Sequence, residues 1–173
     1  IEGFKRTIQY SEAHGDRYSA GHSYNGIAEI ERSRGNLQGA EEGYFKALGL
    51  LESIGTGQSV LLRLNLALVQ LAREKFDEAR GSLELSLHIL ARQGWAPMKG
   101  AAHMAMLSCA AAEQNWESWD HHIGQAITIL DETGFVDKDV AWLAHLAGDL
   151  ARKQGKSWRG IQAYQIARSQ YKA

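Results

Sequence analysis

Glycines recur along this chain with a spacing that constrains its fold more than any other feature. Gly15, Gly55, Gly94 and Gly134 lie 40, 39 and 40 residues apart, and each closes a segment with the composition of a helix. Self-similarity at a fixed period of roughly 20 to 50 residues is typical of repeat architectures. The sequence therefore predicts tandem repeats of about 40 residues.

A second series of breaks lies about halfway between these glycines. The breaks fall at Gly35-Asn36, Glu74-Lys75, Gln114-Asn115 and Gly155-Lys156. Glycine or asparagine at such a point accepts the left-handed conformation that ends a helix. Each period is accordingly predicted to be a helix, a short turn and a second helix.

Apolar residues recur at steps of three and four within the predicted helices, which places them on one helical stripe. In the first period the stripe contains Leu37, Ala40, Tyr44, Ala47, Leu48 and Leu51. We expect an all-α fold, an α-solenoid of antiparallel helix pairs with about nine helices. The expected single repeat domain, 1–173, contains a lone second helix of a truncated repeat at 1–14 and four repeats, at 17–54, 57–93, 97–133 and 138–173.

Composition supports a folded, helical chain without a membrane span. Hydrophobic residues make up 45% of the sequence, and Pro97 is the single proline. The most apolar run, 60–72, is interrupted by polar residues and is shorter than the roughly 18 residues needed to cross a bilayer. With Cys109 alone, no internal disulfide can form, so a cytoplasmic location is the expectation. Because the chain starts at Ile1 without a leader, we expect a fragment of a longer protein.

Several residue patterns resemble the tetratricopeptide-repeat (TPR) family, in which a large and a small residue in the first helix precede Ala-x3-aromatic-x2-Ala in the second. The matching segments are Tyr24-x2-Ile27-Ala28 with Ala40-x3-Tyr44-x2-Ala47, Leu66-Ala67 with Ala79-x3-Leu83, and Ala147-Gly148 with Tyr164-x2-Ala167. In the third repeat Trp119 replaces the small residue. The period of 40 exceeds the usual length of about 34, so the chain resembles a long-repeat variant of the family.

This resemblance implies a protein–protein interaction scaffold that binds a peptide, a helix or a partner domain, which could belong to the same chain. The chain also resembles, more distantly, the TPR segments of large bacterial signalling proteins, such as eukaryotic-like serine/threonine kinases and related ATPase regulators. By that resemblance it would be a regulatory segment of such a protein.

In the TPR family the first helices of the pairs line a concave groove, and the resemblance implies the same role here. The implied groove residues are His22, Asn25, Glu29, Arg32, Leu61, Leu64, Asn65, Leu68, Met104, Ser108, Trp142, His145, Asp149 and Arg152. They form an apolar middle with polar ends. The leucines of 61–71 cover more than one stripe, so they either pack inside the stack or present an apolar surface to a ligand.

The sequence offers no signature of catalysis or of a cofactor. His121 and His122 are adjacent and point about 100 degrees apart on a helix, and His103 has no partner at helical spacing, so we expect structural or surface roles for the histidines and no metal site. Glycines are isolated at helix ends rather than clustered in a phosphate-binding loop, and no Gly-x-Ser-x-Gly nucleophile motif occurs. We therefore expect a protein that is not an enzyme.

Two alternatives to peptide binding remain open. The repeats could form a spacer or a self-association module that joins copies through apolar residues at the two ends, Phe4, Ile8, Ile166 and Tyr171. The C-terminal end is locally basic and could contact nucleic acid through Arg152, Lys153, Lys156 and Arg159, although basic side chains also suit a solvated helix end.

Overall fold

The computed structural model describes residues 1–55 and 59–171, and these residues form helices, turns and short loops without a strand. The helices are α1 (Glu2–Ala13), α2 (Arg17–Ser33), α3 (Leu37–Glu52), α4 (Ser59–Ala72), α5 (Phe76–Gln93), α6 (Ala96–Ala112), α7 (Trp116–Thr133), α8 (Lys138–Lys153) and α9 (Ser157–Gln170). The predicted all-α helical-repeat fold is thus confirmed. Within the described ranges, no helix combines the length and apolar character required to cross a bilayer.

The expected single repeat domain divides into two compact units, Ile1–Lys75 and Phe76–Ala173. Each unit is therefore described by itself. Two of the expected repeat limits, the first two residues of 57–93 and the last two of 138–173, lie outside the described residues.

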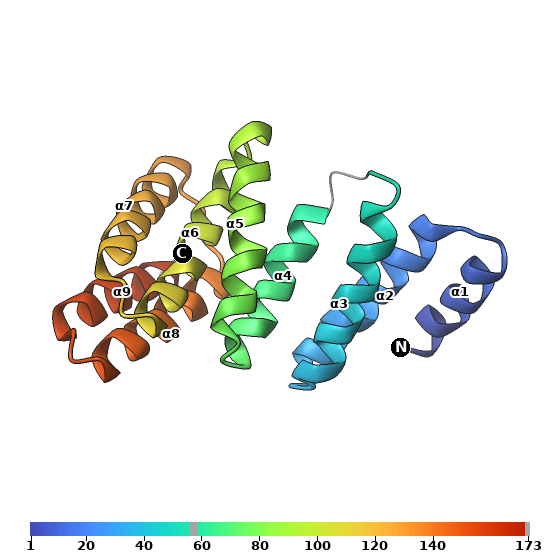
Figure 1. The fold of residues 1–173 in the computed structure, drawn as a ribbon, viewed down its shortest axis with the longest axis horizontal. Helices are drawn as coiled ribbons and strands as arrows, with labels where there is room; N and C mark the ends of the chain where they lie inside the picture. Colours follow the sequence, from blue (N-terminus) through green and yellow to red (C-terminus); the bar gives the residue numbers. More distant parts are fainter. Residues whose placement is uncertain (56–58, 172–173) are drawn as a thin grey trace. The chain divides into compact units, whose positions relative to one another are not determined.

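In the first unit, α1 packs on α2, α2 pairs with α3, and α3 packs on α4 (Figure 1). Its core contains the predicted stripe of α3 together with residues of α2 and α4. The buried members are Ala28, Ala40, Tyr44, Ala47, Leu48, Leu51, Leu62, Leu66 and Val69. Small residues permit the close approach of α2 and α3, because a Cβ added at Gly43 would lie 2.9 Å from Cβ of Ala28.

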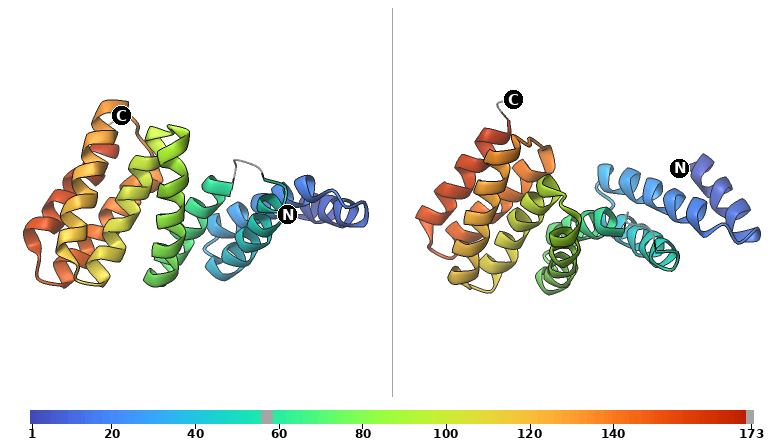
Figure 2. Two further views of the ribbon diagram at one scale, coloured as in Figure 1. Left: turned by 45° about the horizontal axis from the view of Figure 1, so that its top comes forward. Right: turned by 90° about the horizontal axis from the view of Figure 1, so that it is seen from above.

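In the second unit, α6 is the central helix and packs against α5, α7 and α8, while α8 and α9 form the last pair. Figure 2 shows the α8–α9 pair from two further directions. The central position of α6 explains why eleven of its residues are buried. Trp119 of α7, which replaces the small residue of the repeat pattern, is fully buried and fills the space beside it.

The glycine series marks the helix ends as predicted, since Gly15, Gly55, Gly94 and Gly134 all have positive φ. At two midpoint breaks the prediction was wrong in detail. Glu74 and Gln114, with φ of 58° and 55°, adopt the left-handed conformation rather than a glycine or asparagine. Asn115, which follows Gln114, instead caps the N-terminus of α7. Its side chain accepts a hydrogen bond from the backbone N–H of Ser118 at 3.0 Å.

The apolar residues at the two ends of the chain differ in their exposure to solvent, and only some of them are exposed as expected. Phe4 and Tyr171 are exposed, as we expected, but Ile8 is buried and Ile166 is half-buried. Ile161 of α9 is 46% exposed. The buried face of this helix consists of Gly160, Ala163, Ala167 and Gln170.

Candidate partner-binding surface

A polar cluster joins the three helices α2, α3 and α4 in the first unit. Oε1 of Glu29 accepts a hydrogen bond from the hydroxyl of Tyr44 at 2.9 Å and another from Nδ2 of Asn65 at 2.8 Å. Nη2 of Arg32 lies 3.6 Å from the other carboxylate oxygen of Glu29. Burial, followed by the charge of Glu29, raises the pKa of Tyr44, so its hydroxyl remains a donor at neutral pH. This cluster fixes the rotamers of three groove residues predicted from the sequence.

Next to the cluster lies a cavity of about 210 Å³. It is lined by His22 and Asn25 of α2, Leu51 of α3, and Leu61, Leu62 and Asn65 of α4. Nε2 of His22 and Oδ1 of Asn25 are buried and have no hydrogen-bond partner among the described residues. The wall of this cavity thus combines the polar residues His22, Asn25 and Asn65 with the apolar residues Leu51, Leu61 and Leu62.

The leucines of α4 do not share one environment. Leu61 is 39% exposed, whereas Leu64 and Leu68 are each only 9% exposed. Packing therefore accounts for Leu64 and Leu68, and Leu61 is the predicted groove leucine that offers surface to a partner. The sequence left packing and exposure open for these leucines, and each alternative holds for part of the set.

In the second unit the predicted groove residues of α8 lie at the surface. Trp142, His145 and Arg152 are exposed, and Asp149 is half-buried. Oδ1 of Asp149 accepts a hydrogen bond from the hydroxyl of Tyr164 at 2.6 Å, and Nδ1 of His145 lies 3.4 Å from Oδ2. The hydrogen bond from Tyr164 is the main reason that the pKa of Asp149 is lowered.

Two pairs of residues occupy corresponding positions in the two units. Glu29 and Tyr44 are 15 residues apart, as are Asp149 and Tyr164. In each pair an acid on the first helix of a repeat accepts a hydrogen bond from a tyrosine on the second helix. The tyrosine of the TPR-like pattern is thus both a packing residue and a hydrogen-bond donor.

Met104 and Ser108 of α6 were expected in the groove, but both side chains are fully buried. The reason is the central position of α6, which is covered by α5, α7 and α8. Neither residue offers surface to a partner in this structure.

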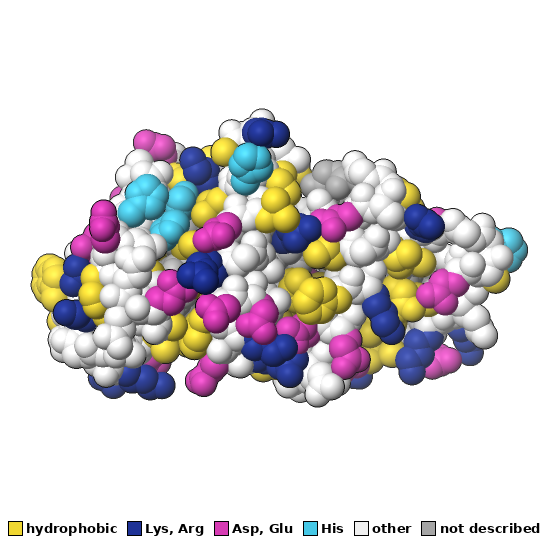
Figure 3. Space-filling view, viewed as in Figure 1, with side chains coloured by type: hydrophobic (Ala, Val, Ile, Leu, Met, Phe, Trp, Pro, Cys, Tyr) yellow, Lys and Arg dark blue, Asp and Glu magenta, His cyan; other side chains and the backbone are white. Residues whose placement is uncertain are grey.

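Two histidines for which the sequence indicated no interaction are in contact between α6 and α7. Nδ1 of His103 lies 2.9 Å from Nδ1 of His122, and both rings are buried. Burial lowers the pKa of each imidazole to about 4, so both are neutral at pH 7. Over α7, Figure 3 shows histidine side chains gathered at the surface. Among the described residues, no group of three or more His, Cys, Asp or Glu is placed to hold a metal ion.

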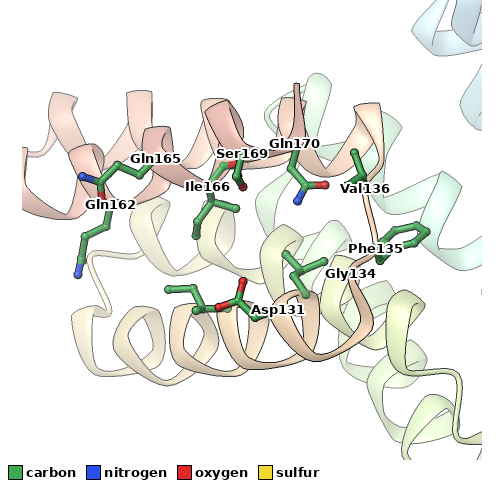
Figure 4. Close-up of a pocket in the computed structure, with 11 residues that line it drawn as sticks. Asp131, Gly134, Phe135, Val136, Gln162, Gln165, Ile166, Ser169 and Gln170 are labelled. Atoms are coloured by element: carbon green, nitrogen blue, oxygen red, sulfur yellow. The ribbon is translucent and has the colours of Figure 1, made fainter. Parts of the chain in front are cut away.

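A larger groove, which the sequence did not indicate, runs between α7 and α9 (Figure 4). Its volume is about 460 Å³. Ile166 and Gln162 of α9 face Asp131 of α7 across it. At one end the backbone N–H of Asp137 donates to Oε1 of Gln170 at 3.0 Å, which ties the α7–α8 loop to α9.

The basic residues at the C-terminal end are partly engaged within the protein. Arg159 forms two hydrogen bonds with the carboxylate of Asp120, at 3.0 and 2.7 Å. Lys156 and Arg159 both lie over the ring of Trp116, at 5.4 and 5.5 Å from its centroid. These contacts favour a structural role for two of the four basic residues considered for nucleic-acid binding.

Comparisons with known proteins place the fold but not the family. The chain shares its fold with a protein of known structure. It is similar to the crystal structure of BtubC (BKLC) from P. vanneervenii, with a TM-score of 0.68, 17% sequence identity and 89% of this chain covered. The match spans 64% of the length of BtubC. No family model matches the sequence, and no curated protein matches it.

Proposed function

We propose that this chain is a non-catalytic interaction module that binds a polypeptide partner through the surface around α2 and α4. The observation that carries the proposal is the cavity that the exposed Leu61 borders together with the polar residues His22, Asn25 and Asn65. A peptide supplies both apolar side chains and hydrogen-bonding groups. A surface that offers apolar contacts and hydrogen bonds together can therefore bind a peptide without ion pairs.

The polar cluster supports the proposal through preorganisation. Asn65 is held by Glu29, and Glu29 is held by Tyr44, whose ring is fully buried. A binding surface whose side chains are fixed before the partner arrives loses less conformational entropy on binding.

The wider setting is also part of the proposal. We infer a regulatory segment of a larger bacterial signalling protein, of the TPR type and located in the cytoplasm. The repeat pattern and the glycine period support the family, and the free, buried thiol of Cys109 suits a reducing compartment.

The proposal is tested by panning a library of displayed random peptides against the full chain. Enriched peptides are expected to bind the unmodified protein, and Leu61→Glu is expected to weaken them at least about tenfold, because it places a charge on the apolar border of the cavity. Leu61 is better suited to this test than the buried Leu64, whose substitution would disturb folding. Leu85→Glu is the matched control, since Leu85 is 41% exposed on α5 in the other unit. Peptides that bind Leu61→Glu with unchanged affinity would refute the proposed surface.

A further inference from the structure

The groove between α7 and α9 in the second unit combines apolar and polar surface. Ile127 and Leu130 of α7 and Ile166 of α9 contribute apolar side chains to its lining. Gln162 of α9 lies opposite Asp131 of α7 (Figure 4). Because Ile127 and Asp131 are both exposed, the groove is open to solvent along α7. An open groove suits a segment of polypeptide laid along it better than a small molecule, which is normally enclosed over most of its surface.

Three glutamine side chains in this lining favour an extended segment over a helix. They belong to Gln162, Gln165 and Gln170 of α9. Oε1 of Gln170 accepts a hydrogen bond from the backbone N–H of Asp137, whereas the amides of Gln162 and Gln165 form no hydrogen bond with a described residue. A glutamine amide both donates and accepts. An extended segment has unpaired backbone N–H and C=O groups to offer these amides, while the backbone groups of a helix are already paired.

The charge of the groove indicates the charge of its partner. Asp131 is the one charged residue among the described residues of the lining. Other carboxylates of the second unit have partners within the protein, since Asp120 binds Arg159 and Asp149 accepts a hydrogen bond from Tyr164. Asp131 has no such partner among the described residues. A cationic side chain complements it, and an exposed ion pair of this kind contributes more to specificity than to affinity.

We propose that the groove between α7 and α9 is a second docking surface, which binds an extended polypeptide segment with aliphatic side chains next to a lysine or an arginine. The aliphatic side chains pack against Ile127 and Ile166. The backbone of the segment bonds with the amides of Gln162 and Gln165, and its cation pairs with Asp131. The inference goes beyond the proposed function, because this groove lies in the other unit and does not require the surface around α2 and α4.

The test begins with a library of random dodecapeptides, displayed on phage and panned against the full chain carrying Leu61→Glu, in which the surface around α2 and α4 is blocked. Enriched peptides are expected to contain lysine or arginine beside aliphatic residues. Adding Ile127→Glu is expected to weaken the synthetic peptides at least about tenfold, because it places a charge on the apolar surface of the groove. The matched control is Ile161→Glu, since Ile161 is exposed on α9 outside the lining. Failure to enrich any peptide, or equal losses in the two variants, would overturn the inference.

A charge reversal tests the contact with Asp131. Asp131→Lys is expected to weaken the basic peptides about tenfold and to favour derivatives in which glutamate replaces the basic residue. Glu132→Lys makes the same change at an exposed neighbour outside the lining, and its effect is expected to be below about threefold. Equal effects of the two substitutions would contradict the proposed ion pair.

NMR of the isotope-labelled chain locates the bound peptide and reports its conformation. The side-chain amide signals of Gln162 and Gln165 are expected to shift on binding, while those of Asn65 in the first unit are not. The Cα chemical shifts of a labelled peptide are expected to indicate an extended backbone. Helical shifts in the bound peptide, or unchanged glutamine signals, would overturn the proposed binding mode.

Panning against the unmodified chain separates this inference from the proposed function. If Leu61→Glu abolishes the binding of every enriched peptide, the inference fails while the proposed function stands. If Leu61→Glu retains all of them and Ile127→Glu abolishes their binding, the reverse holds.

Discussion

The hydroxyl of Tyr44 donates a hydrogen bond to Glu29 from a ring that is completely buried between the helices of the first repeat. Tyr164 and Asp149 repeat the relationship at the other end of the chain, but there the tyrosine is only half-buried. The two carboxylates are similarly exposed, with 39% of the Glu29 side chain and 43% of the Asp149 side chain accessible, so the pairs differ in the burial of the tyrosine. A hydrogen bond contributes more when its donor is removed from water. The hydrogen bond between tyrosine and carboxylate is therefore expected to contribute more to stability in the Tyr44–Glu29 pair than in the Tyr164–Asp149 pair.

Tyr44→Phe is expected to lower the free energy of unfolding by about 1.5 kcal/mol, because it leaves the carboxylate of Glu29 without one of its donors. Tyr164→Phe is expected to cost less, since the half-buried Tyr164 lies closer to solvent and water already competes with its hydrogen bond. Urea denaturation of both variants measures the difference, with Tyr10→Phe, on a ring that is 67% exposed, as the neutral control. Equal losses in the two variants would contradict the argument from burial.

Gly148→Ala is expected to destabilise the α8–α9 pair. A Cβ at this position would lie 2.5 Å from the ring of Tyr164, so the tyrosine must move and its hydrogen bond to Asp149 must lengthen. Overpacking of this kind costs about 1 to 3 kcal/mol. The control is Gly124→Ala on α7, where the added carbon meets nothing within 4 Å beyond its chain neighbours and the backbone of its own helix. That variant is expected to be more stable than the parent by up to about 1 kcal/mol, because alanine is the better helix former. Thermal unfolding of the two proteins should shift in opposite directions.

Acid is expected to weaken the second unit through His103 and His122. Their pKa in the folded chain is about 4, below the ordinary value of 6.5, so the unfolded chain binds more protons once the pH falls below about 6.5. The stability contributed by the neutral pair is complete above pH 6.5 and is lost as the pH falls toward 4. The charge of Lys99 and the neighbouring ring of His121 lower the pKa of His103 further.

The double variant His103→Leu, His122→Leu isolates the contribution of the two histidines to the acid sensitivity. Between pH 7 and pH 4.5 the parent is expected to lose at least about 1 kcal/mol more than the variant, since each unit of pKa difference corresponds to about 1.4 kcal/mol. Urea unfolding at the two pH values provides the comparison. An identical pH dependence in parent and variant would contradict the assignment of this acid sensitivity to the two histidines.

Asn115→Ala is expected to cost about 1 kcal/mol, because it removes the side-chain cap at the first turn of α7. Asn115→Asp keeps an acceptor oxygen and should leave stability within about 0.5 kcal/mol of the parent. Circular dichroism during urea unfolding would decide between the capping role and the left-handed turn that the sequence suggested for this residue. A loss in the aspartate variant as large as in the alanine variant would contradict the cap.

Helix number and turn positions were predictable because they depend on local signals, namely the glycine period and the three- and four-residue steps of the apolar stripe. The pair of Glu29 and Tyr44 could have been found as well, since the two residues lie at similar distances on either side of the turn at Gly35. The contact between His103 and His122 could not be predicted from the spacing of residues within one helix, because it joins α6 to α7 and depends on how these helices cross. The burial of Met104 and Ser108 was missed for a related reason, as it depends on how many helices cover α6.

The left-handed turns at Glu74 and Gln114 have a practical consequence for protein engineering. Each holds a side chain in a backbone conformation that costs a non-glycine residue about 1 kcal/mol or more. Both side chains are exposed and lie on a turn, so glycine at these two positions would relieve the backbone without altering any packed face. The resulting sequence would carry a glycine at every break between helices, which is a suitable starting point for designed arrays of greater length.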